Sequence, residues 1–303
     1  MLSDSISSKT EEQPYCKIDE QNPPADLFHD QPRYEMCRIP DPSMTVMHGF
    51  PIVVLQMEQS NSPLRTQLSS DTFQLAYYSS HGNLLQPINE NPNGKNIKKA
   101  LIMIHGSGRN AEDYFCVALS LVPKDERDSV LVIAPKFLAP VDISGINNQT
   151  NFLIWQEDEA PPEYPMAHSW RYGADALNGP VSSYGAIDHL VKYLSTASKF
   201  PNLKLVSIAG HSAGGQVAHR WALLSEIKAT RTCMLPQVEI RAVAANPRSY
   251  CYLNGKRMIL DQETNITRLD YPSAKEVQHC PDYNQWNWGL EGGGDLDPVV
   301  PYK

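Results

Sequence analysis

The stretch KLVSIAGHSAGGQVAHRWALL, at Lys204–Leu224, joins a short apolar run to a helical pattern through a tight turn that holds a serine between glycines. A strand that passes directly into a helix is the repeating unit of α/β folds, because the helix returns across the sheet to the next parallel strand. This stretch therefore favours a sheet of parallel strands that is covered by helices.

Further apolar runs predict strands along most of the chain. Several are nearly continuous, as expected where a strand is buried on both faces of a sheet, and the first two are predicted to pair antiparallel. The predicted strands are Pro51–Met57, Phe73–Ser79, Lys99–Gly106, Ser129–Pro135, Asn202–Gly210 and Val238–Asn246. Together they indicate an α/β fold with a mostly parallel sheet and helices on both faces.

Besides the helix after Ser212, which carries Val217, Trp221 and Leu224 on one face, two amphipathic helices are predicted between these strands. Asn110 suits the N-cap of the first helix, and Glu112 and Asp113 suit its first turn, where the helix dipole favours negative charge. The second helix begins near Ser183. Apolar residues spaced i, i+3, i+4 and i+7 predict buried stripes at Tyr114, Val117, Ala118 and Leu121, and at Ile187, Leu190, Val191 and Leu194.

The remaining segments divide the chain further. Residues 1–48 are polar and aperiodic, and we expect a dispensable arm ahead of a single α/β domain at residues 49–303. Residues 136–180 form a long insertion, in which Trp155 and Trp170 either wall an acyl-binding cleft or bury the underside of the insertion. Residues 247–303 are irregular after a hairpin expected at Tyr250–Leu260.

Composition excludes some partners. A formal net charge of −8 argues against a nucleic-acid surface, and no apolar run approaches the roughly 20 residues of a membrane span. The N-terminal segment lacks the apolar core of a signal peptide, which predicts a cytoplasmic protein. Glycosylation sequons at Asn148 and Asn265 keep secretion as the alternative. Nothing here indicates the oligomeric state.

The chain holds six cysteines. Cys116 lies on the apolar side of the first helix and is predicted to be a buried thiol. Cys251 and Cys280 flank a loop-rich segment and are the preferred disulfide pair, although sequence alone does not determine pairing.

The turn at Gly210-His211-Ser212-Ala213-Gly214 matches the pattern G-x-S-x-G. In such a nucleophile elbow, a strained strand-to-helix turn raises the serine hydroxyl above the sheet, and side chains two residues before and after it would collide. Ser212 is therefore the candidate nucleophile; the alternative is an ordinary Gly-Ser turn.

A second glycine-rich turn follows the strand that ends at Gly106. Acyl transfer needs backbone N–H groups aimed at the oxyanion, and we assign these to Gly106, Ser107 and Gly108 together with Ala213, the residue after the nucleophile. A phosphate-binding turn is the weaker alternative, because neither the P-loop ending nor the G-x-G-x-x-G spacing is present. His105 is expected to pack within the loop.

These two turns, in this order, resemble those of the α/β-hydrolase superfamily over roughly Phe73–Asn246. More narrowly, HGSGRNAEDYF, SSYGAIDHLVKYL, FPNLKLVSIAGHSAGGQ, ANPRSYCYL and CPDYNQWNWGLE resemble a family of largely uncharacterised fungal and microbial α/β-hydrolases. The resemblance implies a serine esterase or lipase that acts on a small-molecule acyl substrate without a cofactor or a metal.

The catalytic acid and histidine do not fit this resemblance. Members of the family carry them on loops after two further strands, about where this sequence reaches Lys303, so we expect those C-terminal strands to be missing. After Ser212 the only histidines are His219, which the helix carries away from the hydroxyl, and His279, which lies beside a cysteine and a proline. His168 has the wrong chain order for the triad.

Two classes of function therefore remain. The first is a carboxylic-ester hydrolase that uses Ser212 and the backbone oxyanion hole. The alternative is a truncated or non-catalytic α/β-hydrolase-fold protein that binds a ligand or a partner without turnover. Asp295 and Asp297 lack the further oxygen ligands of a calcium site, so no metal site is assigned.

Overall fold

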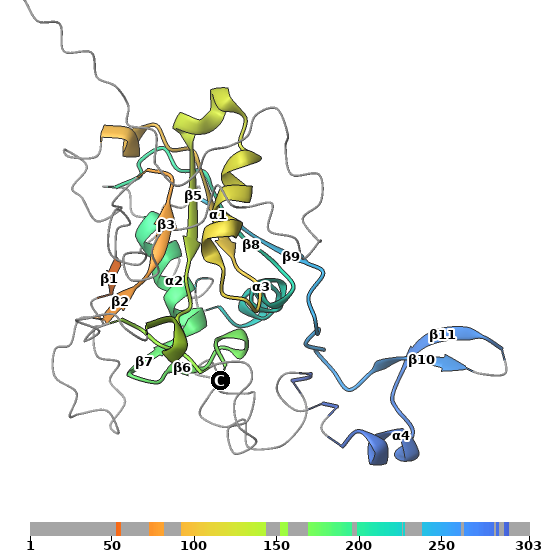
Figure 1. Cartoon of the computed structure of the whole chain (residues 1–303). Coiled ribbons are helices and arrows are strands. Elements are labelled where there is room, and N and C mark those ends of the chain that lie inside the picture. Colours follow the sequence, from red (N-terminus) through yellow and green to blue (C-terminus); the bar gives the residue numbers. More distant parts are fainter. Residues whose placement is uncertain are drawn as a thin grey trace, which may run out of the picture.

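The computed structural model describes residues 53–55, 73–81, 92–143, 152–156, 169–195, 199–225, 227, 238–261, 264–281, 283–284 and 288–290. The arm predicted at residues 1–48 lies outside them. The centre is a five-stranded sheet in the order β3-β5-β4-β8-β9 (Figure 1). Its strands are β3 (Tyr77–Ser79), β4 (Lys99–Ile104), β5 (Val130–Pro135), β8 (Leu205–His211) and β9 (Glu239–Ala245).

This sheet is mainly parallel, as the sequence predicted. Only β3 runs antiparallel, against β5, and the other three pairings are parallel. The middle strand β4 matches β8 from Lys99 opposite Leu205 to Ile104 opposite Gly210. The two glycine-rich turns that follow these strands therefore leave the sheet at the same edge.

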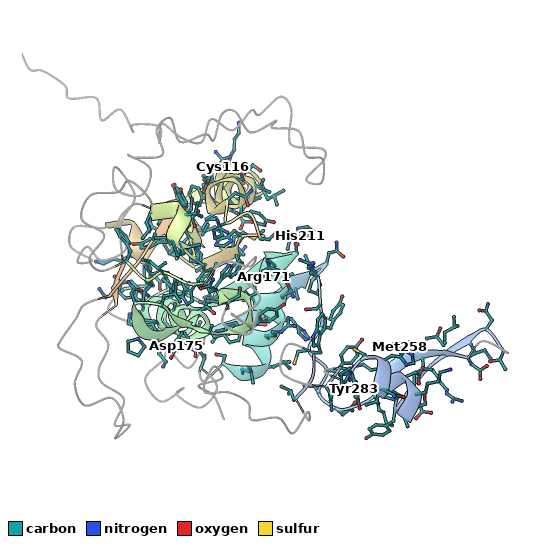
Figure 2. The ribbon with its side chains drawn as sticks, turned by 60° about the horizontal axis from the view of Figure 1, so that its bottom comes forward. Cys116, Arg171, Asp175, His211, Met258 and Tyr283 are labelled. Carbon is teal, nitrogen blue, oxygen red and sulfur yellow. The ribbon has the colours of Figure 1, made fainter. Side chains whose placement is uncertain are left out.

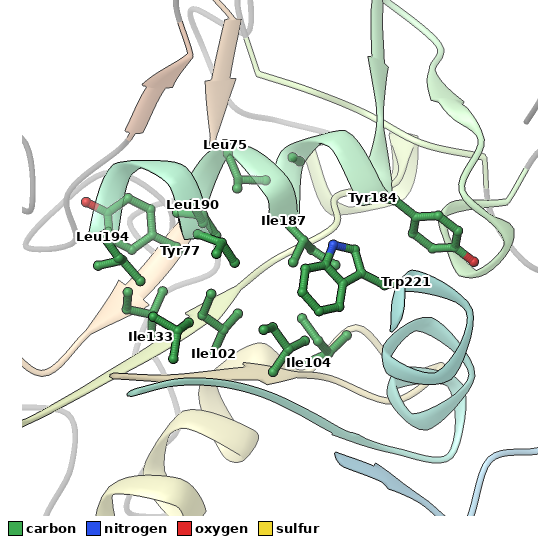
Figure 3. Packing of buried hydrophobic residues seen from close by; sticks show 14 of the residues in the cluster. Leu75, Tyr77, Ile102, Ile104, Ile133, Tyr184, Ile187, Leu190, Leu194 and Trp221 are labelled. Carbon is green, nitrogen blue, oxygen red and sulfur yellow. The ribbon is translucent and has the colours of Figure 1, made fainter. Parts of the chain in front are cut away.

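Helices cover both faces of the sheet (Figure 3). On one face, α2 (Ser183–Leu194) and α3 (Ala213–Leu224) pack onto apolar side chains of the strands. On the other face, α1 (Ala111–Ser120) packs over β5 and its neighbours. The stripe predicted for the helix near Ser183 is confirmed, because all four of its residues are buried.

The stripe predicted for α1 is partly wrong. The helix ends at Ser120, so Leu121 falls outside its last turn and is 73% exposed. Val117 and Ala118 of the predicted stripe are buried, together with Ala111 and Phe115, and Val122 is buried beyond the helix end. Asn110 is at the predicted N-cap position, but its side chain bonds Asp113 instead of a helix N–H.

The short strands ahead of the sheet follow the prediction. β1 (Val53–Leu55) pairs antiparallel with β2 (Phe73–Leu75). The predicted strand Phe73–Ser79 is interrupted at Ala76, which separates β2 from β3. β3 is thereby released to pair with β5 in the main sheet.

The described part of the insertion packs against the core. Trp155 and Trp170 are both fully buried, and the ring of Phe137 stacks on that of Trp170 with centroids 5.2 Å apart. The indole N–H of Trp155 donates to the carbonyl of Ala174 at 3.1 Å, just before the small pair β6 (Asp175–Ala176) and β7 (Gly179–Ser182). The two tryptophans therefore bury the underside of the insertion.

The C-terminal segment forms a hairpin and a short helix that project from the body of the molecule (Figures 1 and 2). β10 (Arg257–Asp261) pairs antiparallel with β11 (Ile266–Asp270), and α4 (Ala274–His279) follows. The hairpin predicted at Tyr250–Leu260 was therefore misplaced. Asn254 bends the chain there by accepting a hydrogen bond from the N–H of Lys256, and Tyr252 bridges to Gly289 instead.

β9 is unusually exposed for a strand of this sheet. Within the described residues it pairs only with β8, and Val243 on the face shared with α1 is 51% exposed. Most large apolar residues that are exposed in the described chain lie from β9 onwards. They are Val243, Tyr250, Leu253, Met258, Leu260, Ile266, Leu269, Tyr271 and Trp288.

The cysteines differ from the prediction. Cys116 is disulfide-bonded and not a free thiol, and its partner lies outside the described residues. Cys251 and Cys280 are both free, so the predicted pair is wrong. Cys251 is buried behind α3 whereas Cys280 ends the exposed α4, which keeps them apart. In the described part of the chain, no helix has the length and apolar character needed to cross a membrane.

Candidate active site

Ser212 is the single residue between β8 and α3. Its backbone adopts φ 56° and ψ −116°, a conformation that L-residues rarely adopt and that costs on the order of 1–3 kcal/mol. Its N–H donates to the carbonyl of Ala245 at 3.1 Å, and its own carbonyl accepts the N–H of Gln216 at 3.0 Å. Ser212 therefore lies in a strained turn that joins a strand directly to a helix.

The glycines around Ser212 are required by close packing. A Cβ at Gly210 would collide with the backbone of Gly214, and a Cβ at Gly214 would collide with the carbonyl oxygen of Ile104. A Cβ at Gly215 would lie 2.6 Å from the carbonyl oxygen of Ala245. The start of α3 therefore lies directly against the ends of β4 and β9, and the collisions at Gly210 and Gly214 are those expected from the sequence.

The turn after β4 lies at this same edge of the sheet. Arg109 closes it by donating its N–H to the carbonyl of Gly106 at 3.1 Å, with a positive φ of 54°. Ser107 and Gly108 at its tip are exposed. The backbone N–H of Gly106 also donates a hydrogen bond to the hydroxyl of Tyr114. Burial raises the pKa of this hydroxyl, and the bond from Gly106 offsets only part of the rise. The N–H of Gly106 is therefore already bonded, whereas the N–H of Ser107 lies in the exposed part of the turn.

His105 is a structural residue of this loop. Its Nδ1 bonds the carbonyl of Gly106 at 2.8 Å, and its Nε2 accepts the N–H of Phe137 at 3.0 Å, so the imidazole is neutral with its proton on Nδ1. Complete burial lowers its pKa to about 3, although the bond to Gly106 opposes this shift. Both nitrogens are occupied, in agreement with the expectation that His105 packs within the loop.

An ion pair that the sequence did not predict secures the same turn. Arg109 Nε donates to Asp142 Oδ2 at 2.7 Å, and the same oxygen accepts the N–H of Ala139 at 2.8 Å. Both charged side chains are largely buried. The pair ties the turn after β4 to the start of the insertion. Asp142 lies in no recognisable motif, so the sequence offered no signal for it.

A buried polar network supports the other side of the elbow. Gln216 Nε2 donates to Ser249 Oγ at 2.5 Å, and Arg220 donates to the same hydroxyl at 3.0 Å. Arg220 also contacts the Ser249 carbonyl at 3.3 Å and lies over the ring of Tyr172. These contacts hold the loop after β9 against α3, and the sequence analysis missed them.

The candidate histidines are engaged elsewhere. His219 Nε2 accepts the N–H of Cys251 at 3.2 Å, on the side of α3 that faces the C-terminal segment. His279 is exposed, its Nδ1 lies 2.6 Å from the carbonyl of Lys275, and its helix α4 lies apart from the sheet in Figures 1 and 2. His168 lies outside the described residues. The structure therefore brings neither His219 nor His279 to the elbow.

Among the described residues, no three His, Cys, Asp or Glu side chains are grouped as a metal site would require. No family model matches the chain, and no curated protein matches it.

Two solved structures are similar in part. One is LpqC, a poly(3-hydroxybutyrate) depolymerase from Bordetella parapertussis, at 22% identity and a TM-score of 0.32, covering 60% of this chain and 48% of its own. The other is poly(aspartic acid) hydrolase-1 from Sphingomonas sp. KT-1, at 17% identity and a TM-score of 0.33, covering 68% of this chain and 60% of its own. The chain thus spans 48% and 60% of the lengths of these two proteins.

Proposed function

We propose that this protein has an α/β-hydrolase fold and is a serine hydrolase of carboxylic esters, with Ser212 as the nucleophile. The observation that carries the proposal is the strained φ of Ser212 between β8 and α3, with glycines packed against the backbone on both sides. Strain of this kind persists only where the surrounding structure enforces it, and it is found predominantly at functional sites.

The proposed chemistry is acyl transfer. Ser212 Oγ attacks the carbonyl carbon of an ester and passes its proton to a base, and the acyl-enzyme forms as the alcohol leaves. The backbone N–H groups of Ala213 and Ser107 are proposed to stabilise the oxyanion, with Gly106 and Gly108 shaping the turn. The start of α3 adds its dipole to this stabilisation.

The base and the acid are not assigned to the described residues. His105 is neutral with both nitrogens bonded, and His219 is held by Cys251. The proposed hydrolase therefore needs a base from residues outside the described ranges, and without one it would turn over short p-nitrophenyl esters slowly. The oxyanion hole and binding alone leave rates roughly 10³–10⁴ above the uncatalysed reaction, whereas loss of the histidine from a triad costs on the order of 10⁶.

A non-catalytic protein of the same fold is the second candidate. It is favoured by the exposure of β9, whose outer edge is unpaired within the described residues, and by the position of His279 away from the elbow. Such a protein would bind an acyl ligand or a partner without hydrolysing it.

Labelling with a fluorophosphonate probe distinguishes the two candidates, because the probe reacts only with an activated serine. If the protein is a hydrolase, the probe should label the full chain at Ser212, and Ser212→Ala should abolish the labelling. Ser107→Ala is the matched control, since it removes a hydroxyl from the adjacent turn but keeps the backbone N–H. A folded protein that resists labelling would support the non-catalytic candidate.

A further inference from the structure

The second sequon, Asn265-Ile266-Thr267, lies at the tip of the β10–β11 hairpin. Asn265 is the last loop residue before β11; its N–H donates to the carbonyl of Asp261 at 2.8 Å and its φ is 56°. Thr264 to Thr267 are all exposed. Among the described residues, the side-chain amide of Asn265 makes no hydrogen bond.

This position can accommodate a large substituent. The hairpin projects from the body of the molecule, so its tip faces solvent (Figure 1). An N-linked glycan is bulky and hydrophilic, and it is accepted at surface sites that a folded chain leaves open. Asparagine also tolerates the left-handed conformation of this turn, so the acceptor residue itself introduces little strain.

The disulfide at Cys116 is an independent observation that points to the same compartment. Structural disulfides form and persist in oxidising environments such as the secretory pathway, where N-linked glycans are also added.

The apolar surface of the hairpin is a third observation that favours a glycan at its tip. Met258, Leu260, Ile266 and Leu269 are each more than half exposed, and a glycan at its tip would shield this apolar surface from other molecules.

We propose that Asn265 is N-glycosylated and that the protein enters the secretory pathway. The amide nitrogen of Asn265 would attack the first sugar carbon of an oligosaccharide linked to a lipid pyrophosphate. A carbon–nitrogen bond forms, the sugar–phosphate bond breaks, the lipid pyrophosphate leaves, and the amide proton passes to a base. This proposal is independent of any hydrolase activity at Ser212.

The direct test uses protein purified from the cells that naturally produce it. Trypsin cleaves after Arg257 and Arg268 and releases Met258–Arg268, which contains the whole sequon. Glycosidase release in heavy-oxygen water should convert Asn265 to an aspartate that carries the heavy label, as read by mass spectrometry. Recovery of this peptide unmodified, without glycosidase treatment, would overturn the proposal.

Variants secreted from a eukaryotic host then locate the signal. In an Asn148→Gln background, which leaves only the sequon at Asn265, the protein should shift in gel mobility on glycosidase treatment. Asn265→Gln and Thr267→Ala should abolish the shift, whereas Thr267→Ser keeps the required hydroxyl and should preserve it. A shift that survives Thr267→Ala would contradict the assignment to Asn265.

Discussion

Replacing Ser212 with glycine should stabilise the fold while removing the nucleophile. At φ 56° and ψ −116° the Cβ of serine is strained, at a cost on the order of 1–3 kcal/mol, and glycine avoids this cost. Glycine also loses more backbone entropy on folding, which offsets about 0.5–1 kcal/mol. The net gain in unfolding free energy should therefore lie between roughly 0 and 2.5 kcal/mol, with about 1 kcal/mol at the middle of the range. Ser212→Ala keeps the Cβ and should change stability little.

Chemical denaturation of the three proteins, with a common slope, would measure this difference. Asn265→Gly is the matched control, because its φ is also 56° but asparagine tolerates this conformation, so the gain there should be small. If Ser212→Gly is no more stable than Ser212→Ala, the serine is not strained and the elbow geometry that supports the proposed function is wrong.

Three further predictions concern the surroundings of the elbow. Gly214→Ala should lower the unfolding free energy by about 2 kcal/mol or more in denaturation experiments, because its Cβ meets backbone oxygens, whereas Gly108→Ala, which meets only a side chain at 3.4 Å, should be nearly neutral. The pKa of His105 is lowered to about 3 in the folded protein, against 6.5 in the unfolded chain, so its neutral form stabilises the fold fully above pH 6.5 and this stabilisation is lost as the pH falls towards 3. His105→Gln should therefore flatten the fall in unfolding free energy over this pH range. An unchanged slope would count against a buried neutral imidazole. The edge of β9, unpaired among the described residues, should promote self-association at micromolar concentrations in size-exclusion chromatography. Val243→Lys should reduce this association, whereas Leu121→Lys at the end of α1 should not; equal effects, or a monomer at these concentrations, would show that the edge of β9 is not a contact.

The sheet could be predicted because its strands carry their own signal. Nearly continuous apolar runs such as Ser129–Pro135 have few alternatives to a buried strand, and the observed β5 lies within that prediction. The helical stripe of α2 was likewise sufficient on its own. The stripe of α1 was less accurate because the register depends on where the helix ends, and a boundary at Ser120 moved Leu121 into solvent.

The candidate site was predictable where steric requirements are local and not where contacts are distant. Gly210 and Gly214 indicate the turn from the sequence alone, because only glycine fits where two backbone segments are in contact. The ion pair between Arg109 and Asp142 joins residues 33 positions apart with no pattern between them, so only the fold reveals it.

The C-terminal segment shows why an elbow alone does not establish catalysis. The strained conformation of Ser212 is held by contacts with β4 and β9, which both precede the hairpin in the sequence. The strained turn at Ser212 is therefore formed although β9 is exposed and His279 lies on α4, away from the sheet. Elbow geometry reports that the fold can present a nucleophile, whereas turnover requires a base within hydrogen-bond reach of it. The two properties can be tested separately: stability measurements on Ser212→Gly test the backbone strain at the serine, and fluorophosphonate labelling tests for a base.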